Sequence, residues 1–320
     1  MGNESNILTI AIPTFNRPSQ FQIAIESVIK QYRTGIDILI SDNSENEDTK
    51  RIVEDKFLGL SYVSYVKNSK NIGPDANFLQ CLRIGKGRFV LMLSDDDVLL
   101  DGAVDEIINL ILDFPNIPII YLNHYAWGRF IGDKLPTGSE VEVNRFISTI
   151  SYDLTYISSI VFNKNKFLEV NNPEQSIGSF LLITQIAVEM IGRNRYGIIT
   201  KRECVKGQKI PGKYGGFDIY RVYAANWKEI LVSAYHNGYI RRFTVRRAFS
   251  RTIYSFLIKS TIAARNKENM KGYLKNKKLL FEATNTYPIA WLLLYPTMFL
   301  PRSIMYVLMV LHERISNLEK

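Results

Sequence analysis

Short apolar runs alternate with amphipathic segments along residues 7–93 of the chain. Apolar runs predict buried strands, whereas apolar side chains spaced three and four apart, as at Phe21, Ala24, Ile25 and Val28, predict helices. The predicted strands are 7–13, 36–44, 60–66 and 88–93, and the predicted helices are 18–31, 45–57 and 74–85. This alternation predicts a mostly parallel sheet with helices on both faces.

Beyond residue 115 the alternation is looser. The runs at 117–125 and 156–163 predict two further strands, and 180–192 predicts a helix. The clearest α/β signal therefore lies in the first 115 residues.

Polar residues follow each of the first four predicted strands. Because the carboxyl ends of parallel strands meet at one edge of a sheet, we expect these loops to converge where α/β proteins bind ligands. The loops are PTFNRP at 13–18, SDNSENED at 41–48, NSKNIG at 68–73 and SDDD at 94–97. The chain has neither GxGxxG nor a P-loop motif, which makes a dehydrogenase or a P-loop kinase a poor match.

Three carboxylates, Asp95, Asp96 and Asp97, follow the apolar run 89–93 directly. Adjacent like charges repel unless a positive group lies between them. Mg²⁺ and Mn²⁺ prefer such hard oxygen ligands, usually one or two carboxylates together with phosphate and water. The run predicts a cation site, with a solvated acidic loop as the alternative.

The composition is that of an ordinary globular protein, with 46% hydrophobic and 22% charged residues. Two widely separated cysteines, Cys81 and Cys204, indicate neither a disulfide framework nor a zinc site. The first residues lack a basic stretch followed by an apolar one, so we expect no secretory signal and a cytoplasmic protein.

The net charge of +9 is concentrated in one segment. Residues 241–278 hold twelve Lys or Arg and one acid, Glu268. Nucleic acid, anionic lipid or a phosphorylated substrate could each bind such a segment.

The apolar tail at 287–311 narrows this choice. Pro288, Pro296, Pro301 and Arg302 divide it into pieces too short to span a bilayer, which favours interfacial helices, with a buried core helix as the alternative. A basic segment beside an aromatic, apolar tail favours an anionic membrane surface over nucleic acid. We therefore expect a peripheral protein at the inner face of the cell membrane, with no nucleic-acid partner.

Four segments together resemble the inverting glycosyltransferases of family 2. They are TIAIPTFNRP at 9–18, ILISDNSENEDT at 38–49, KNIGPDANF at 70–78 and VLMLSDDDVLL at 90–100. The resemblance covers residues 5–115 well, 116–220 loosely and the last hundred hardly at all.

The resemblance implies a GT-A fold, a Rossmann-like mixed sheet with helices on both faces. Residues 1–220 would form the catalytic domain, with a donor half at about 1–115 and an acceptor half at about 116–220. Residues 221–320 would form a helical, basic, membrane-associating region.

The resemblance also implies a nucleotide-diphosphate site with Mn²⁺ or Mg²⁺. Asp96 and Asp97 would belong to the metal site, Asp96 as the likelier ligand and Asp97 as an acceptor-side or supporting carboxylate. Asp95 would lie beside the ribose or the metal. Matching DDVL at 96–99 to the end of the family's acidic motif places Ser94 where its first acid usually stands, so these roles could shift by one position.

Two further loops would hold the nucleotide. By the resemblance, Asp42 recognises the base and could accept the N3–H of uracil. Phe15 would lie against the base, and Asn71 and Gly73 would shape the loop beside the diphosphate. The residues implied for the first loop are Pro13, Thr14, Phe15, Asn16 and Arg17.

Inversion requires a general base for the acceptor hydroxyl. Family members often carry an acidic pair at the start of a helix after the sixth strand, but the corresponding segment 177–190 has none. Asp153, Glu174 and Glu189 are the candidate bases.

These residues predict a metal-dependent glycosyltransferase. It would transfer a hexosyl or N-acetylhexosaminyl group from a UDP-linked donor to a surface glycan or a lipid-linked acceptor. One alternative is a metal-dependent nucleotidyltransferase, although these usually have a glycine-rich phosphate loop. The other is a non-catalytic nucleotide-sugar-binding protein at the membrane surface, suggested by the missing acidic pair.

Overall fold

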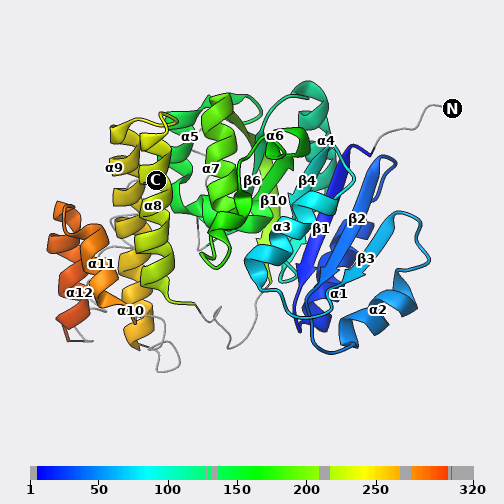
Figure 1. Ribbon diagram of the computed structural model, residues 1–320, viewed down its shortest axis with the longest axis horizontal. Coiled ribbons are helices and arrows are strands. Elements are labelled where there is room, and N and C mark those ends of the chain that lie inside the picture. Colours follow the sequence, from blue (N-terminus) through cyan, green and yellow to red (C-terminus); the bar gives the residue numbers. More distant parts are fainter. Residues whose placement is uncertain are drawn as a thin grey trace.

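The structure, a computed structural model, describes residues 6–126, 129–130, 136–208, 217–266, 275–301 and 304. Figure 1 shows the sheet and its helices on the right and a group of helices, α8 to α12, on the left. The amino-terminal half of the chain thus forms one side of the molecule and the last hundred residues the other.

One continuous sheet has the strand order β3-β2-β1-β4-β9-β6-β10-β5, with β7 paired to β6 and β8 to β10. Its strands are β1 (Leu8–Thr14), β2 (Ile36–Asp42), β3 (Val63–Lys67), β4 (Phe89–Met92), β5 (Asp97–Leu99), β6 (Ile119–Ala126), β7 (Arg129–Phe130), β8 (Glu140–Glu142), β9 (Ile160–Asn163) and β10 (Tyr196–Gly207).

The first four strands are parallel, as the alternation predicts. Beyond β4 the sheet is mixed, because β9 lies antiparallel between β4 and β6, and β5 pairs antiparallel with β10. The predicted strand 156–163 is wrong in its first half. Residues 157–159 form a 3-10 turn instead of a strand. In this turn the Ser158 hydroxyl donates a hydrogen bond to Asp97 of the acidic loop.

The helices are α1 (Pro18–Ile29), α2 (Asp48–Lys56), α3 (Pro74–Ile84), α4 (Ala103–Asp113), α5 (Val143–Ile150), α6 (Lys164–Phe167), α7 (Leu182–Asn194), α8 (Trp227–His236), α9 (Arg242–Thr252), α10 (Ile258–Asn266), α11 (Lys277–Thr284) and α12 (Tyr295–Phe299). Proline occupies the first position of α1 and α3, where its missing N–H costs no helical hydrogen bond.

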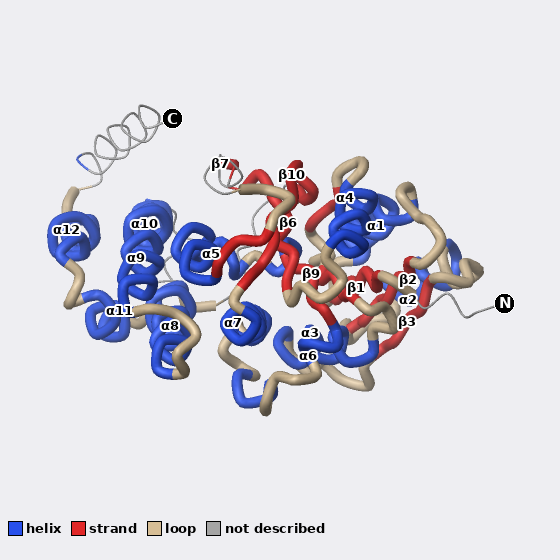
Figure 2. The backbone as a smooth tube through the Cα atoms, turned by 90° about the horizontal axis from the view of Figure 1, so that it is seen from above, coloured by secondary structure: helices blue, strands red, loops and turns tan. Residues whose placement is uncertain are grey.

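Two cores lie on the two faces of the sheet. Phe21 of α1 and Ile107 of α4 are fully buried on one face. Leu82 of α3 and Ile186 of α7 are buried on the other. Figure 2 shows α1 and α4 on one side of the strands and α3, α6 and α7 on the opposite side. The predicted α/β architecture with helices on both faces is confirmed.

The helices after residue 220 join the same core as α7. Trp227, Phe249 and Leu280 are fully buried in this cluster. The Trp227 ring N–H donates to the Thr252 hydroxyl at 3.0 Å, so its polar atom is satisfied as well. The division of the chain at residue 220 stays a prediction, since helices on both sides of it share one core.

The apolar tail combines buried and exposed side chains. Tyr287, Ala290 and Leu294 pack into the core, whereas Leu292 and Phe299 are 74% and 78% exposed. Across the part of the chain that the structure describes, every helix is too short or too polar to cross a bilayer. Of the tail predicted at 287–311, residues 302–303 and 305–311 lie outside the described residues.

Candidate active site

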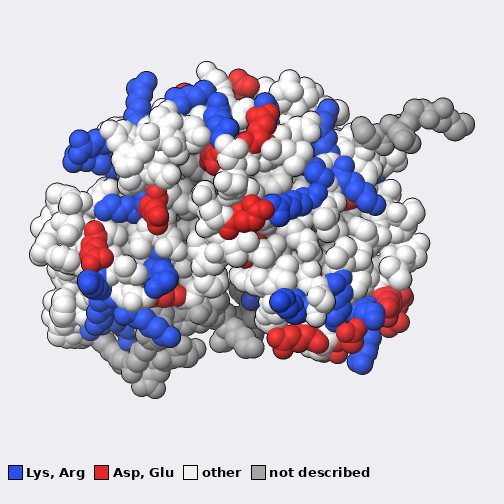
Figure 3. All heavy atoms as spheres, viewed as in Figure 1, with Lys and Arg blue, Asp and Glu red and all other residues white. Residues whose placement is uncertain are grey.

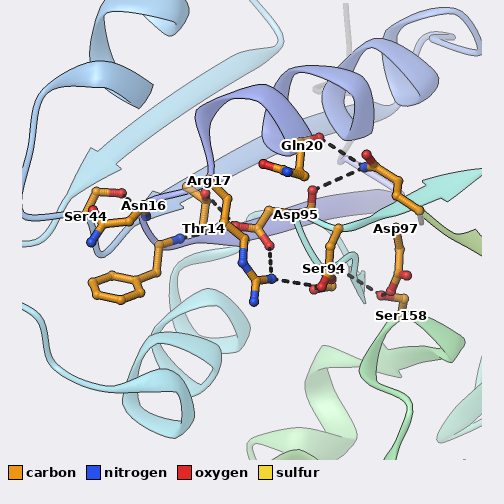
Figure 4. Close-up of polar contacts among 12 residues, drawn as sticks. Thr14, Asn16, Arg17, Gln20, Ser44, Ser94, Asp95, Asp97 and Ser158 are labelled. Atoms are coloured by element: carbon orange, nitrogen blue, oxygen red, sulfur yellow. Dashed lines mark hydrogen bonds and ion pairs between the residues drawn. The ribbon is translucent and has the colours of Figure 1, made fainter. Parts of the chain in front are cut away.

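Two of the polar loops meet where β1 and β4 end. These strands are parallel neighbours, with Ala11 opposite Met92. Residues 13–17 and 94–97 therefore leave the sheet side by side, as Figure 4 shows. The prediction that strand alternation brings these loops to one edge is confirmed for this pair.

Asp95 ties the two loops together. Its Oδ2 accepts hydrogen bonds from the Thr14 hydroxyl at 2.8 Å and the Phe15 backbone N–H at 3.3 Å. Its Oδ1 accepts from the Arg17 guanidinium at 3.1 Å. Burial raises the pKa of Asp95 to about 6, against the lowering effect of the Arg17 charge. Asp95 therefore positions the loop predicted to hold the nucleotide.

Asp96 is the most accessible carboxylate of the triplet, with 31% of its side chain exposed. One oxygen accepts from Arg17 at 2.9 Å, and the other accepts from the Ser94 hydroxyl. Arg17 thus lies between two carboxylates and screens their repulsion. Ser94 thus serves as a hydrogen-bond donor to Asp96.

Asp97 begins β5, and its hydrogen bonds come from the turn before β9 instead of from the loop 13–17. It accepts a hydrogen bond from the Ser158 hydroxyl at 2.5 Å and another from the Tyr156 hydroxyl. Burial, and next the neighbouring Asp96 charge, raise the pKa of Asp97 to about 7. Its labelled partner in Figure 4 is Ser158, in the 3-10 turn before β9, so Asp97 joins the acidic loop to that turn.

The acidic loop fits a divalent cation of the kind that nucleotide diphosphates bind. Among the described residues no three His, Cys, Asp or Glu side chains already form a cluster that could hold a metal. Mg²⁺ and Mn²⁺ need only one or two carboxylates when phosphate oxygens and water fill the other positions. Asp96 offers an accessible hard oxygen at the ligand edge, which suits that arrangement.

Asp42 ends β2 at the same edge of the sheet. Its Oδ1 accepts from the Ser44 N–H and its Oδ2 from the Tyr65 hydroxyl, both at 2.8 Å. The Ser44 hydroxyl in turn accepts from the Asn16 N–H at 2.8 Å, which links this loop to the first one. The sequence pattern did not predict a role for Tyr65. The one feature that could have indicated its contact with Asp42 is the position of Tyr65 on β3, the strand beside β2.

Asn71 and Gly73 form a third loop beside Asn43. Asn71 Oδ1 accepts from the Asn43 amide at 2.7 Å and from the Gly73 N–H at 2.9 Å. Gly73 has φ +83°, a left-handed conformation that glycine adopts without strain, and α3 starts directly after it. A cleft of about 530 Å³ lies between residues 44–47 and 67–71, next to this loop.

The three candidate bases each pair with an arginine. Asp153 is buried, with its Oδ2 3.8 Å from Arg251. Glu174 forms an ion pair with Arg83 on the surface, and Glu189 lies 2.7 Å from Arg193 on the same helix. The assignment of a base among Asp153, Glu174 and Glu189 stays a prediction.

The segment that lacks the acidic pair is held by a buried carboxylate instead. Asp75, in the first turn of α3, accepts at one oxygen from the N–H groups of Gly178 (2.8 Å) and Phe180 (2.9 Å). Phe180 has φ +61° and is 46% exposed. Strained backbone of this kind is often found at functional sites. Sequence reasoning missed Asp75.

Replacing Asp75 with alanine is expected to lower the free energy of unfolding by about 2 kcal/mol, because two backbone donors lose their acceptor. Asp75→Asn is the conservative variant, for which an intermediate loss is expected: its amide oxygen can accept from Gly178 and Phe180, but its NH2 cannot accept from the Ser179 and Leu182 N–H groups that also contact the carboxylate. Urea denaturation of both variants measures the difference. Equal stability of Asp75→Ala and wild type would show that water replaces the carboxylate at no cost.

The mixed sheet, with an acidic loop at the carboxyl ends of its parallel strands, defines a nucleotide-diphospho-sugar transferase fold of the GT-A type. The sequence pattern of glycosyl transferase family 2 matches residues 9–226, which is more than half of the chain. The chain belongs to glycosyl transferase family 2, as the four segments predict.

Two relatives with assigned functions align with parts of the chain. A Campylobacter jejuni GalNAc(5)-diNAcBac-PP-undecaprenol beta-1,3-glucosyltransferase is 35% identical over 30% of this chain and 32% of its own length. The abequosyltransferase RfbV of Salmonella typhimurium is 23% identical over 54% of this chain and 57% of its own length. The chain thus spans less than two thirds of either relative.

Solved structures share the fold. Staphylococcus aureus TarS 1–349 in complex with UDP-GlcNAc has a TM-score of 0.63 at 16% identity, covering 89% of this chain and 81% of its own. The mannosyltransferase PcManGT of Pyrobaculum calidifontis, in complex with GDP-Man and Mn²⁺, has a TM-score of 0.52 at 10% identity, covering 87% and 86%. These likenesses confirm the predicted GT-A fold.

Proposed function

We propose that the protein transfers a sugar, with inversion, from a UDP-linked donor to a surface glycan or a lipid-linked acceptor, with Mn²⁺ or Mg²⁺ as cofactor. The observation that carries the proposal is Asp95, which joins the loop 13–17 to the acidic loop while Asp96 stays accessible beside it. Complexes of TarS with UDP-GlcNAc and of PcManGT with GDP-Man and Mn²⁺ support the donor class and the metal.

In this proposal Asp96, assisted by Asp97, would hold the cation. When bound, the cation supplies positive charge that stabilises the departing nucleotide diphosphate. Arg17 is already directed at the acidic loop, and its guanidinium can also bind a phosphate oxygen. Asp95 keeps the Thr14–Phe15 backbone in place, and Asp42 with its Tyr65 partner would recognise the base.

The acceptor hydroxyl must lose a proton as it attacks the anomeric carbon. A carboxylate within hydrogen-bond reach of that hydroxyl would take the proton. Asp153, Glu174 and Glu189 remain the candidates, and each would first have to separate from its arginine or share it.

A lipid-linked acceptor is supported by the name of one relative and by the surface of the protein. The Campylobacter relative is named for a PP-undecaprenol substrate. Figure 3 shows Lys and Arg side chains over the helical region, near α9. Leu292 and Phe299 are exposed on the neighbouring tail. Basic charge together with exposed apolar side chains supports attachment to an anionic membrane surface.

The identity of the released product tests this function. With a UDP-sugar panel, Mn²⁺ and lipid-linked bacterial glycans, we expect UDP to accumulate together with a lengthened glycan. Release of pyrophosphate would indicate a nucleotidyltransferase. Donor binding without any turnover across the panel would indicate a non-catalytic binding protein.

A further inference from the structure

A groove of about 540 Å³ lies between α7 and α8, and residues 175–179 form part of its lining. The two helices pack against each other directly, and Figure 1 shows them side by side. None of the residues of the acidic loop or the nucleotide loops lines the groove, whereas Glu189, one of the candidate bases, does.

Polar side chains line the groove at helical spacing. On the α8 side the polar residues are three or four positions apart, from the residue before the helix to the residue after it. On the α7 side two polar residues are four positions apart. They are Asn226, Glu229, Ser233 and Asn237 on one side and Gln185 and Glu189 on the other. Amide, hydroxyl and carboxylate groups supply both donors and acceptors, as a ligand rich in hydroxyl groups requires.

The lining also includes apolar side chains. Val188, Ile230 and Ala234 line the groove and are 2%, 7% and 3% exposed. Tyr239 adds an aromatic ring. Sugar rings present apolar C–H faces together with hydroxyl edges, so the partly exposed Tyr239 ring beside polar side chains suits them. Ligand sites commonly combine apolar lining with a few well-placed polar groups.

The charges in and beside the groove balance. Glu189 is neutralised by Arg193 at 2.7 Å, and the groove itself holds Glu229 and Arg221. By contrast, a separate groove between α5 and α9 is lined by Arg145, Arg241 and Arg247, among others. The positive charge of the groove between α5 and α9 suits an anionic ligand. The balanced charge of the groove between α7 and α8 suits a neutral ligand.

One end of the groove is connected to the donor half. The Asn226 amide donates to the Ser179 carbonyl at 2.9 Å, which joins the α8 side to the segment 175–181. Asp75 holds that same segment through Gly178 and Phe180, and α3 begins directly after the Asn71–Gly73 loop. A ligand in the groove would therefore rest against the segment that faces the donor half.

We propose that the groove between α7 and α8 binds a neutral oligosaccharide, the part of the acceptor that lies beyond the sugar that receives the transfer. That this oligosaccharide is part of an acceptor rests on the proposed function. Binding of the oligosaccharide in the groove requires neither the metal nor the nucleotide.

Ser233→Trp fills the groove from an exposed position on α8, so the fold is expected to be retained. His236→Trp is the matched control, because this exposed residue on the same helix does not line the groove. A printed array of bacterial surface oligosaccharides, neutral and acidic, measures binding of the full chain without donor. Isothermal titration with UDP and Mn²⁺ measures the donor site separately.

We expect wild type and His236→Trp to bind neutral oligosaccharides, and Ser233→Trp to bind them more than tenfold more weakly while keeping its UDP affinity. Retained glycan binding by Ser233→Trp, binding to acidic glycans alone, or no binding by wild type would each overturn the inference. Failure of all three proteins to bind UDP would instead count against the proposed function.

Discussion

Replacing Asp96 with alanine is expected to slow sugar transfer by roughly 10²–10³-fold, the usual loss when one group that stabilises transition-state charge is removed. Asp96 is the most accessible acid of the triplet, and its oxygens contact only flexible polar side chains, Arg17 and Ser94, in the described structure. Initial rates of UDP release with saturating Mn²⁺ measure the effect.

Asp101→Ala is the control for this loss, because Asp101 is an exposed acid two residues after the end of β5. We expect it to keep a near wild-type rate. Thermal unfolding of both variants separates a catalytic loss from a folding defect. A well-folded Asp96→Ala protein with an unchanged rate would remove Asp96 from the site.

Replacing Leu292 and Phe299 together by serine is expected to weaken binding to anionic vesicles roughly 30-fold. The two side chains are 74% and 78% exposed, so their loss leaves the core intact. Partial burial of both at a membrane interface supplies about 2 kcal/mol, which corresponds to that factor. Co-sedimentation with phosphatidylglycerol–phosphatidylcholine vesicles at high salt isolates this apolar contribution, because salt screens the basic residues.

Leu58→Ser with Leu168→Ser is the matched control. These leucines are 54% and 66% exposed, and they follow α2 and α6, away from the tail. We expect the control to sediment like wild type. The tail is not a membrane-binding surface if both double variants sediment equally. The same conclusion follows if wild type remains in the supernatant when the vesicles are pelleted.

The fold of residues 7–93 could be predicted from the sequence because its signals are local. Strands β1, β2 and β4 are short, mostly apolar runs, whereas β3 is more polar. Parallel connections place the loops after these strands at one edge of the sheet. Once β1 and β4 are neighbours, Thr14 and Asp95 must lie close together. Their side chains form a hydrogen bond of 2.8 Å at this point.

The partners that hold these acids could not be predicted, because they come from distant parts of the chain. Ser158 reaches Asp97 across 61 residues, and Asp75 reaches Phe180 across 105. The insertion of β9 between β4 and β6 brings the first pair together, and no local pattern in 156–163 specifies that neighbour. Long-range pairing is thus what the sequence pattern leaves open.

The tail illustrates a different limit. Its apolar content predicts burial in a core or at an interface, and the structure uses different residues for each possibility. Leu294 is fully buried, whereas Leu292 two residues earlier is exposed. Hydrophobicity by itself does not tell which side of such a segment packs against the protein.

Isothermal titration of UDP into wild type and Asp96→Ala, with Mn²⁺ and with a chelator, tests the central claim most directly. The claim is that the acidic loop joined to residues 13–17 by Asp95 is a metal-assisted nucleotide site. We expect Mn²⁺ to tighten UDP binding to wild type and to leave the weak binding of Asp96→Ala unchanged. An equal gain from Mn²⁺ in both proteins, or no UDP binding by wild type, would contradict the account.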